Sequence, residues 1–456
     1  MSLTKRAKLA VRNRNILQPR YLIIAAAVCH IVLATAVFSV GKSQLAPGQV
    51  YPNGLARFAS DGFLYEQEFT DLKNTLVTQG LWAWWTFPSQ FHVRLYSIPV
   101  MTGSRWFSFN ILLIEPLNLL YYLLILTLIF KLGETIFNSR VGLLAAGIVA
   151  VWPTFLLHTT QLLRDPLLIV VVLTIALSVV FCLARSVPWR QALILGLLAM
   201  AAIVGLRIVR LPMWNLLVVT MAVAIVFLLV RAIRHKDARL GIGIFTGLVM
   251  LAICLTPLFQ KSFHNQQVLR RFRMIDPELM QALRFDEQIA ARRRGFLMRI
   301  DSEGNLYPAE DGSRIDTEVQ YSSLGDMVRH VPRALVVGFF SPFPNMWLKA
   351  GKQVGSTGRW LSGLETIATY LIECLAIVGL WIGRKRPTAW FLAIFAGLGI
   401  GALGLVVNNI GALYRLRYPF WIMLVVFGTG GAVALIEARW PRLASGSAHP
   451  AASKLN

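Results

Sequence analysis

The chain has 456 residues, 56% of them hydrophobic, and a mean hydropathy of +0.60, which excludes an ordinary soluble domain and predicts a polytopic membrane protein. Its net charge of +23 favours anionic lipids or phosphate-bearing substrates. The chain has no Walker-type or dinucleotide glycine motif, so no soluble nucleotide is indicated. We therefore expect membrane lipids, and no nucleic acid, among its partners.

The N-terminal region predicts a first membrane span. Residues 1–20 carry six basic residues and no acid, and the apolar run at 21–40 is long for a signal-peptide core. We expect an uncleaved transmembrane helix that follows a basic cytoplasmic N-terminus. Residues 42–108 then form an exoplasmic loop, whose tryptophan-rich amphipathic segments are predicted to lie in the membrane interface.

Nine more spans are predicted from apolar runs at about 109–130, 141–157, 166–184, 190–206, 212–230, 240–259, 364–382, 388–406 and 416–436. The segment 334–348 is short and interrupted by Pro342 and Pro344. If it crossed the membrane, the basic cluster at 384–386 would lie outside, against the positive-inside tendency. We therefore expect an interfacial or re-entrant segment there, and an all-α protein with about ten transmembrane helices.

This topology divides the chain into regions. A transmembrane catalytic module is expected at 21–259, and a large basic exoplasmic loop with the interfacial segment at 260–350. C-terminal transmembrane helices at 351–437 and a cytoplasmic tail at 438–456 complete the chain. The loops 42–108 and 260–333 are predicted to lie outside, with both termini inside.

The first outer loop holds the candidate general base. If the stretch from Ser60 is helical, Asp61, Tyr65 and Glu68 fall at i, i+4 and i+7 and share one face. Two carboxylates at a membrane surface suit general-base chemistry, with Asp61 taking a proton and Glu68 close to it. The alternative is an amphipathic surface helix whose charges lie in water.

Arginines in three distant stretches are predicted to meet on the outer face, which suggests that they bind a shared anionic ligand. The alternatives are structural: Asp165 suits the first turn of its helix and can pair with Arg164, and arginines can snorkel to lipid headgroups. A lone histidine, such as His158, is also more often structural. The candidate residues in these stretches are Arg164, Asp165, Arg207, Arg210, Arg415 and Arg417, with His158 as a support.

No cofactor is required by the sequence. The acids of the turn-rich stretch 301–312, which resembles a hairpin, do not match the spacing of a calcium loop. The seven histidines form no pair at zinc-ligand spacing. A divalent metal is therefore unsupported.

With these features the chain resembles the C-type integral membrane glycosyltransferases, the superfamily of the protein O-mannosyltransferases and the lipid A aminoarabinose transferase. The resemblance rests on the loop containing Asp61, the helix start at 163–166 and the stretch 414–419 (Tyr-Arg-Leu-Arg-Tyr-Pro). Members often carry adjacent Asp-Glu in the first loop. Here Gly62 follows Asp61, which leaves Glu66 and Glu68 as alternatives for a second acid.

The resemblance implies a sugar donor on a polyprenyl phosphate, used at the outer face of a bacterial inner membrane. The acceptor would be a lipid, a glycan or a protein. Asp61 would act as the general base in an inverting displacement, and the arginines would stabilise the leaving phosphate.

Two other functions remain open. A polymerase or ligase that uses polyprenyl-pyrophosphate-linked glycans would also need arginine-rich outer loops. A flippase or transporter of lipid-linked sugars would predict internal repeats and mid-membrane ionisable residues. The chain shows no repeat, and the apolar runs are nearly free of charge at their centres, with Glu115 and Glu373 as the exceptions.

Overall fold

The computed structural model describes residues 18–103, 109–259, 283–300, 306–308, 314–348 and 355–439. Within these residues, nine helices are long and apolar enough to cross a membrane, in agreement with the predicted polytopic all-α fold. They are α2 (Pro19–Lys42), α5 (Ile111–Ile136), α8 (Asp165–Ala184), α9 (Trp189–Val209), α10 (Trp214–Arg234), α11 (Arg239–Leu255), α17 (Gly355–Gly383), α18 (Pro387–Val406) and α20 (Tyr418–Arg439).

A tenth span is broken rather than straight. The sequence predicts one helix over 141–157, whereas α6 (Ser139–Ala150) and α7 (Pro153–Thr159) meet at a bend of 70°. Trp152 has an extended backbone, with ψ at 113°, because a residue before proline avoids the helical region. Pro153 then opens the new helix, since its fixed φ suits a first turn. The expected number of about ten spans is reached if the bent pair counts as one.

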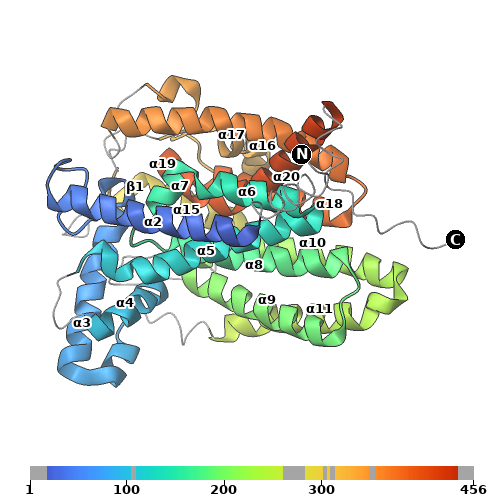
Figure 1. Ribbon diagram of the computed structural model, residues 1–456, viewed down its shortest axis with the longest axis horizontal. Coiled ribbons are helices and arrows are strands. Elements are labelled where there is room, and N and C mark those ends of the chain that lie inside the picture. The colour runs from blue at the N-terminus through green and yellow to red at the C-terminus, as the bar shows by residue number, and fades with distance from the viewer. Residues whose placement is uncertain are drawn as a thin grey trace, which may run out of the picture.

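The first loop folds into helices that cross one end of the bundle, which we call the site end. A 3₁₀ turn (Arg57–Ala59) leads into α3 (Asp61–Thr86), and α4 (Phe91–Gly103) follows. Figure 1 shows α3 standing across the direction of the long helices at this end. Gly80 has a φ of +86° inside α3 and divides it into two helices, because a left-handed backbone interrupts the helical hydrogen bonds.

The large loop contributes a helix, a hairpin and a second helix. These are α15 (Phe285–Leu297), the antiparallel strands β1 (Met298–Ile300) and β2 (Leu306–Pro308), and α16 (Leu324–Phe340). The two paired strands of the expected hairpin are therefore present. The connection between them, at 301–305, lies outside the described residues. Short 3₁₀ turns occur at Leu211–Met213, Lys236–Ala238, Thr256–Phe259 and Pro344–Met346.

Helix α16 is not among the candidate spans, and it ends at Phe340, directly before the Ser341–Pro342 bond. Ala334 lies against Gly404, whereas Gly338, one turn later, lies against Ile400. The helix therefore runs antiparallel to the last part of α18. The membrane placement of this segment, interfacial or re-entrant, stays a prediction.

Glycines allow α17 and α20 to approach each other closely. A Cβ on Gly431 would overlap the carbonyl oxygen of Leu375, and one on Gly428 would lie 2.7 Å from the carbonyl oxygen of Ile372. Helices in a membrane associate mainly through such close packing, since lipid provides no hydrophobic driving force between them. This pair places α19 (Ile410–Leu416), which precedes α20, at the site end.

We expect Gly431→Leu to destabilise the protein by roughly 1–3 kcal/mol, because the new side chain cannot fit between α17 and α20. Gly247→Leu on α11 is the matched control, since a Cβ there meets no atom within 4 Å. Thermal denaturation of both variants in detergent checks the prediction. Equal melting temperatures for the two variants would contradict it.

Candidate active site

Asp61 lies at the start of α3, where the first loop packs against the connection between α7 and α8. Gly62 packs closely in this contact, because a Cβ there would lie 3.4 Å from the carbonyl oxygen of Leu162 and 3.2 Å from the side chain of Leu55. A carboxylate in the first turn is also favoured by the helix dipole. Local sequence thus brings Asp61 next to the residues that begin α8.

An ionic cluster forms around Asp61. Arg415 Nη2 on α19 donates to Asp61 Oδ2 at 2.5 Å, and its Nε lies 2.9 Å from Asp165 Oδ2 on α8. Arg210, between α9 and α10, places Nη1 3.7 Å from Asp165 Oδ1. The Asp165 side chain is only 6% exposed, whereas that of Asp61 is 35% exposed. The sequence-predicted residues Asp61, Asp165, Arg210 and Arg415 therefore come together.

The electrostatics of the cluster keep Asp61 ionised. Burial raises the pKa of its carboxyl, but the charges of Arg415, Arg164 and Arg210 outweigh that effect and hold the pKa below its ordinary value. Burial also raises the pKa of Tyr65 to about 12, so the phenol stays protonated. At neutral pH the site therefore holds a carboxylate that can accept a proton.

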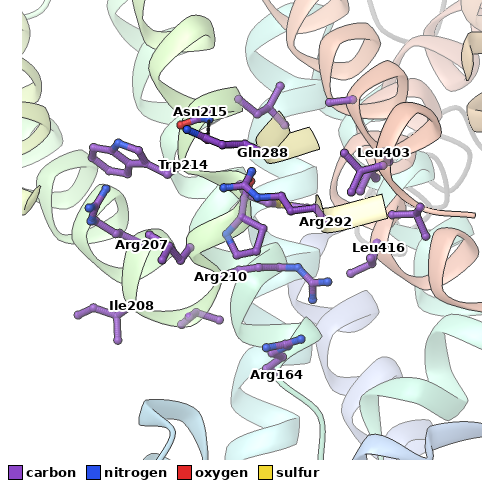
Figure 2. A pocket seen from close by; sticks show the side chains of 18 of the residues that line it. Arg164, Arg207, Ile208, Arg210, Trp214, Asn215, Gln288, Arg292, Leu403 and Leu416 are labelled. Carbon is purple, nitrogen blue, oxygen red and sulfur yellow. Dashed lines mark hydrogen bonds between the residues drawn. The ribbon is translucent and has the colours of Figure 1, made fainter. Parts of the chain in front are cut away.

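A cavity of about 1650 Å³ opens beside this cluster. Figure 2 shows Arg164, Arg210 and Arg292, which come from three separate elements, extending into the same space. Among the described residues that line the cavity there is no aspartate or glutamate. There are five arginines: Arg94, Arg164, Arg207, Arg210 and Arg292.

The cavity continues from these arginines along apolar helix surfaces. On α18 its lining extends from Val407 back to Gly397, a distance of roughly 15 Å along the helix axis. The lining residues on this part of α18, and on α10 beyond Asn215, are all apolar or glycine. The cavity is therefore amphipathic, with a cationic end and a long apolar groove.

The cations at this end repel one another. Burial lowers the pKa of Arg210 to about 9, and the neighbouring charge of Arg164 adds to the effect while Asp165 opposes it. Arg210 still carries a charge at neutral pH. An anion bound between Arg164 and Arg210 would relieve this repulsion, because opposite charge stabilises the charged form of each group.

Helix α15 covers part of the cavity and was not singled out from the sequence. Gln288 is hydrogen-bonded to Asn215 at 3.4 Å, and Arg292 donates to the carbonyl oxygen of Pro212 at 3.1 Å (Figure 2). Phe285, Gln288, Ile289, Arg292 and Phe296 line the cavity and recur at helical spacing. This helical spacing could have been used to predict, from the sequence, a helix in the large loop with one face turned to a cavity.

The two remaining predicted arginines differ in their surroundings. Arg207 lines the cavity, with its guanidinium 4.5 Å from the ring centre of Trp214. Arg417 does not line it, and donates instead to the carbonyl oxygens of Phe339 at 2.9 Å and Ser341 at 2.8 Å. Its guanidinium therefore holds the end of α16, and a role in phosphate binding stays a prediction.

Glu68 is buried and His158 is half-buried, and each holds a backbone group near the site. The backbone N–H of Gln90 donates to Glu68, which links α3 to the start of α4. Nδ1 of His158 is 2.6 Å from the carbonyl oxygen of Thr154, within α7. A direct catalytic role for Glu68 also stays a prediction.

His92 on α4 was missed by the sequence reasoning. It lines the cavity, and its ring lies edge-on to Tyr65 with 4.4 Å between the ring centres. Burial and the charge of Arg164 hold its pKa well below the ordinary value, so the ring is neutral. A lone histidine in a loop carries no sequence signal for this position. No cluster of three potential metal ligands occurs in the described part of the chain.

Comparison with known proteins gives little guidance. No protein-family model matches the chain, and no curated protein is similar to it. Among solved structures it is similar to the oligosaccharyltransferase of Archaeoglobus fulgidus in the apo form, with a TM-score of 0.45 and 11% sequence identity. The match covers 94% of this chain and 52% of that one, so the chain spans about half the length of that protein.

Removing Arg415 should destabilise the protein strongly. Arg415→Gln removes the closest cation of the buried Asp165, whose contact with Arg210 is longer, and breaking one side of a buried ion pair costs about 3–5 kcal/mol. Adding Asp165→Asn should recover part of the loss, because it removes the buried carboxylate that has lost its closest cation. Thermal denaturation in detergent measures both effects.

The control for this prediction is Arg333→Gln, which breaks an ion pair with Asp316 at 3.1 Å whose arginine is 48% exposed. Exposed pairs contribute about 1 kcal/mol or less, so this variant should melt close to the parent. A parent-like melting temperature for Arg415→Gln would contradict the structural role of the buried cluster.

Proposed function

We propose that this protein is a membrane glycosyltransferase that takes its sugar from a polyprenyl-phosphate donor. The observation that carries the proposal is the amphipathic cavity, in which five arginines and no described carboxylate meet a long apolar groove. A phosphate suits arginine, whose planar guanidinium forms two parallel hydrogen bonds to it. A prenyl chain suits the apolar surface that follows. A soluble sugar nucleotide would leave that surface without a ligand.

Asp61 is the proposed general base. It is ionised, partly exposed and next to the cationic end of the cavity. In the proposed reaction the acceptor hydroxyl gives its proton to Asp61, and its oxygen attacks the anomeric carbon of the sugar. The bond from that carbon to the phosphate oxygen breaks with its electron pair, which inverts the anomeric centre and releases polyprenyl phosphate.

The arginines of the cavity would act on the leaving group. Negative charge grows on the phosphate as the glycosidic bond breaks, and cations already in position stabilise that charge without reorganising. Arg164 and Arg210 are nearest to the Asp61 cluster and are the proposed contacts to this phosphate. The acceptor would be a lipid, a glycan or a protein, and the reaction would occur at the outer face of the bacterial inner membrane.

A polyprenyl-pyrophosphate donor, as used by a polymerase or ligase of glycans, is the second candidate. Arg207 and Arg292 lie in the same cavity as Arg164 and Arg210, and they would offer contacts for a second phosphate. Mass spectrometry of the lipid that co-purifies with the protein would distinguish the two donors, because they differ by one phosphate.

Asp61→Asn should lower turnover by roughly two to four orders of magnitude, the usual contribution of a general base. The amide keeps the shape and still accepts a hydrogen bond from Arg415, so folding and donor binding should be nearly unchanged. Transfer is measured in proteoliposomes with a radiolabelled polyprenyl-phosphate sugar. Near-normal turnover in this variant would refute the general-base role.

Glu66→Gln is the matched control for that experiment. Glu66 accepts a hydrogen bond from Asn53 at 2.8 Å, outside the ionic cluster, and glutamine keeps the accepting oxygen. We therefore expect turnover close to that of the parent. A loss as large as that of Asp61→Asn would mean that the charge of the whole helix, and not one carboxylate, governs turnover.

Filling the apolar groove should remove the lipid. Gly397 lines the groove and a Cβ there meets no atom within 4 Å, so Gly397→Phe should place its ring in the groove. We expect the co-purifying polyprenyl-linked species to fall by roughly tenfold or more, which corresponds to about 1.4 kcal/mol of binding free energy.

The control is Gly247→Phe, whose position on α11 is equally open but lies outside the cavity. Quantitative lipid mass spectrometry on both variants gives the result. If Gly397→Phe retained as much prenyl lipid as Gly247→Phe, the groove would not be the binding site of the prenyl chain.

A further inference from the structure

Two irregular chain segments position the ionic cluster. The segment at 54–60 leads into Asp61, and the segment at 160–164 leads into Asp165. The backbone groups of such segments lack the regular partners of a helix, and the second segment is buried among helix ends. Their relative placement decides where Asp61 stands with respect to Arg164 and Asp165.

One side chain joins these segments directly. Gln161 is fully buried, and its Oε1 accepts a hydrogen bond from the backbone N–H of Ala56 at 2.9 Å. Its Nε2 donates to the carbonyl oxygen of Gly54 at 3.4 Å. Ala56 is five residues before Asp61, and Gln161 is three residues before Arg164. The amide therefore connects the two chain segments that carry opposite members of the cluster.

Gln161 is itself held by two further buried residues. Asn118 Nδ2 on α5 donates to the carbonyl oxygen of Gln161 at 3.3 Å. The hydroxyl of Tyr96 on α4 lies 2.7 Å from Asn118 Oδ1 and 3.1 Å from the carbonyl oxygen of Leu163. Asn118 and Tyr96 are also fully buried. The position of Gln161 is thus determined from both sides, by α4 and α5.

We propose that Gln161 is a positioning residue for Asp61, which it holds against Arg164, Asp165 and Arg415 by fixing the segment 54–56. Buried hydrogen bonds of this kind cannot be exchanged for bonds to water, so losing the amide would leave the Ala56 N–H without a partner. The segment before α3 would then shift, and Asp61 would move within the field of the arginines. This role rests on the proposed function of Asp61, although the geometry itself does not depend on it.

The measurable consequence is the titration of Asp61. The groups that face it are Tyr65 on its own helix, His92 on α4, Arg164 and Asp165 at the start of α8, Arg210 between α9 and α10, and Arg415 on α19. The arginines dominate this field and hold the pKa of Asp61 below its ordinary value. If Asp61 moves away from Arg415 and Arg164, its pKa must rise toward that value.

The test is Gln161→Met, which keeps the length of the side chain but removes both hydrogen bonds. Carbodiimide coupling of an amine to Asp61, followed by peptide mass spectrometry across pH, reports the protonated fraction of this carboxyl. We expect the midpoint of labelling to rise by roughly one pH unit in the variant, in the direction of an unperturbed aspartate. A midpoint equal to that of the parent would overturn the proposal.

Tyr122→Phe is the matched control. It removes a buried hydrogen bond of 2.8 Å to the carbonyl oxygen of Ala150, away from the cluster. Its labelling midpoint should stay at the parental value, and an equal rise in both variants would reduce the effect to general destabilisation and overturn the proposal. If Gln161→Met does not fold, Gln161→Asn takes its place, because it keeps the amide but shortens its reach.

The labelling experiment needs neither donor nor turnover, so it separates the two proposals. If Asp61→Asn retained full transfer while Gln161→Met raised the labelling midpoint, the general-base function would fail and the positioning role would stand. If Asp61→Asn abolished transfer while Gln161→Met left the labelling midpoint unchanged, the positioning role alone would fail.

Discussion

The contact of Arg415 with two carboxylates is the interaction on which the arrangement of the site end depends. Its partner Asp61 lies 354 residues away in the sequence, and Asp165 belongs to a third segment. In a region of low dielectric such contacts are strong, but each ion is costly if its partner is missing. Helices α3, α8 and α19 therefore have to assemble together, and the cluster specifies their relative positions more than it adds stability.

The cluster does not balance its own charge. Asp61 and Asp165 face Arg164, Arg210 and Arg415, and the described lining of the neighbouring cavity adds further arginines without adding an acid. Buried like charges are unfavourable unless something else in the site compensates them. An anionic group at the cationic end of the cavity would provide that compensation, and the adjoining groove favours one that carries a long apolar chain. The excess positive charge of the arginines would thus both favour binding of such a molecule and be neutralised by it.

Much of this organisation could be predicted from the sequence, and the failures are local. Hydropathy predicts most of the spans, and the stretch from Asp61 is helical, as helical spacing requires for Tyr65 and Glu68 to share a face. Arg415 and Arg417 could not be distinguished, because they are two residues apart and roughly 200° apart around a helix. Which of them reaches Asp61 depends on the packing of α16 and α19. The bend after α6 and the position of α15 over the cavity likewise depend on contacts between distant segments.

The buried polar residues around the site follow from its irregular backbone. To place a carboxylate and several arginines at one end of a membrane bundle, the chain must leave its helices at the segments 54–60, 160–164 and 341–343. Backbone groups in such segments have no water to bind when they are buried, so side chains must satisfy them. Gln161 does this for the first segment, Asn118 and Tyr96 do it for the second, and Arg417 does it for the end of α16. Buried polar residues that never touch a substrate are therefore a physical requirement of an ionic site built on broken helices, and their hydrogen bonds transmit the geometry of the bundle to Asp61.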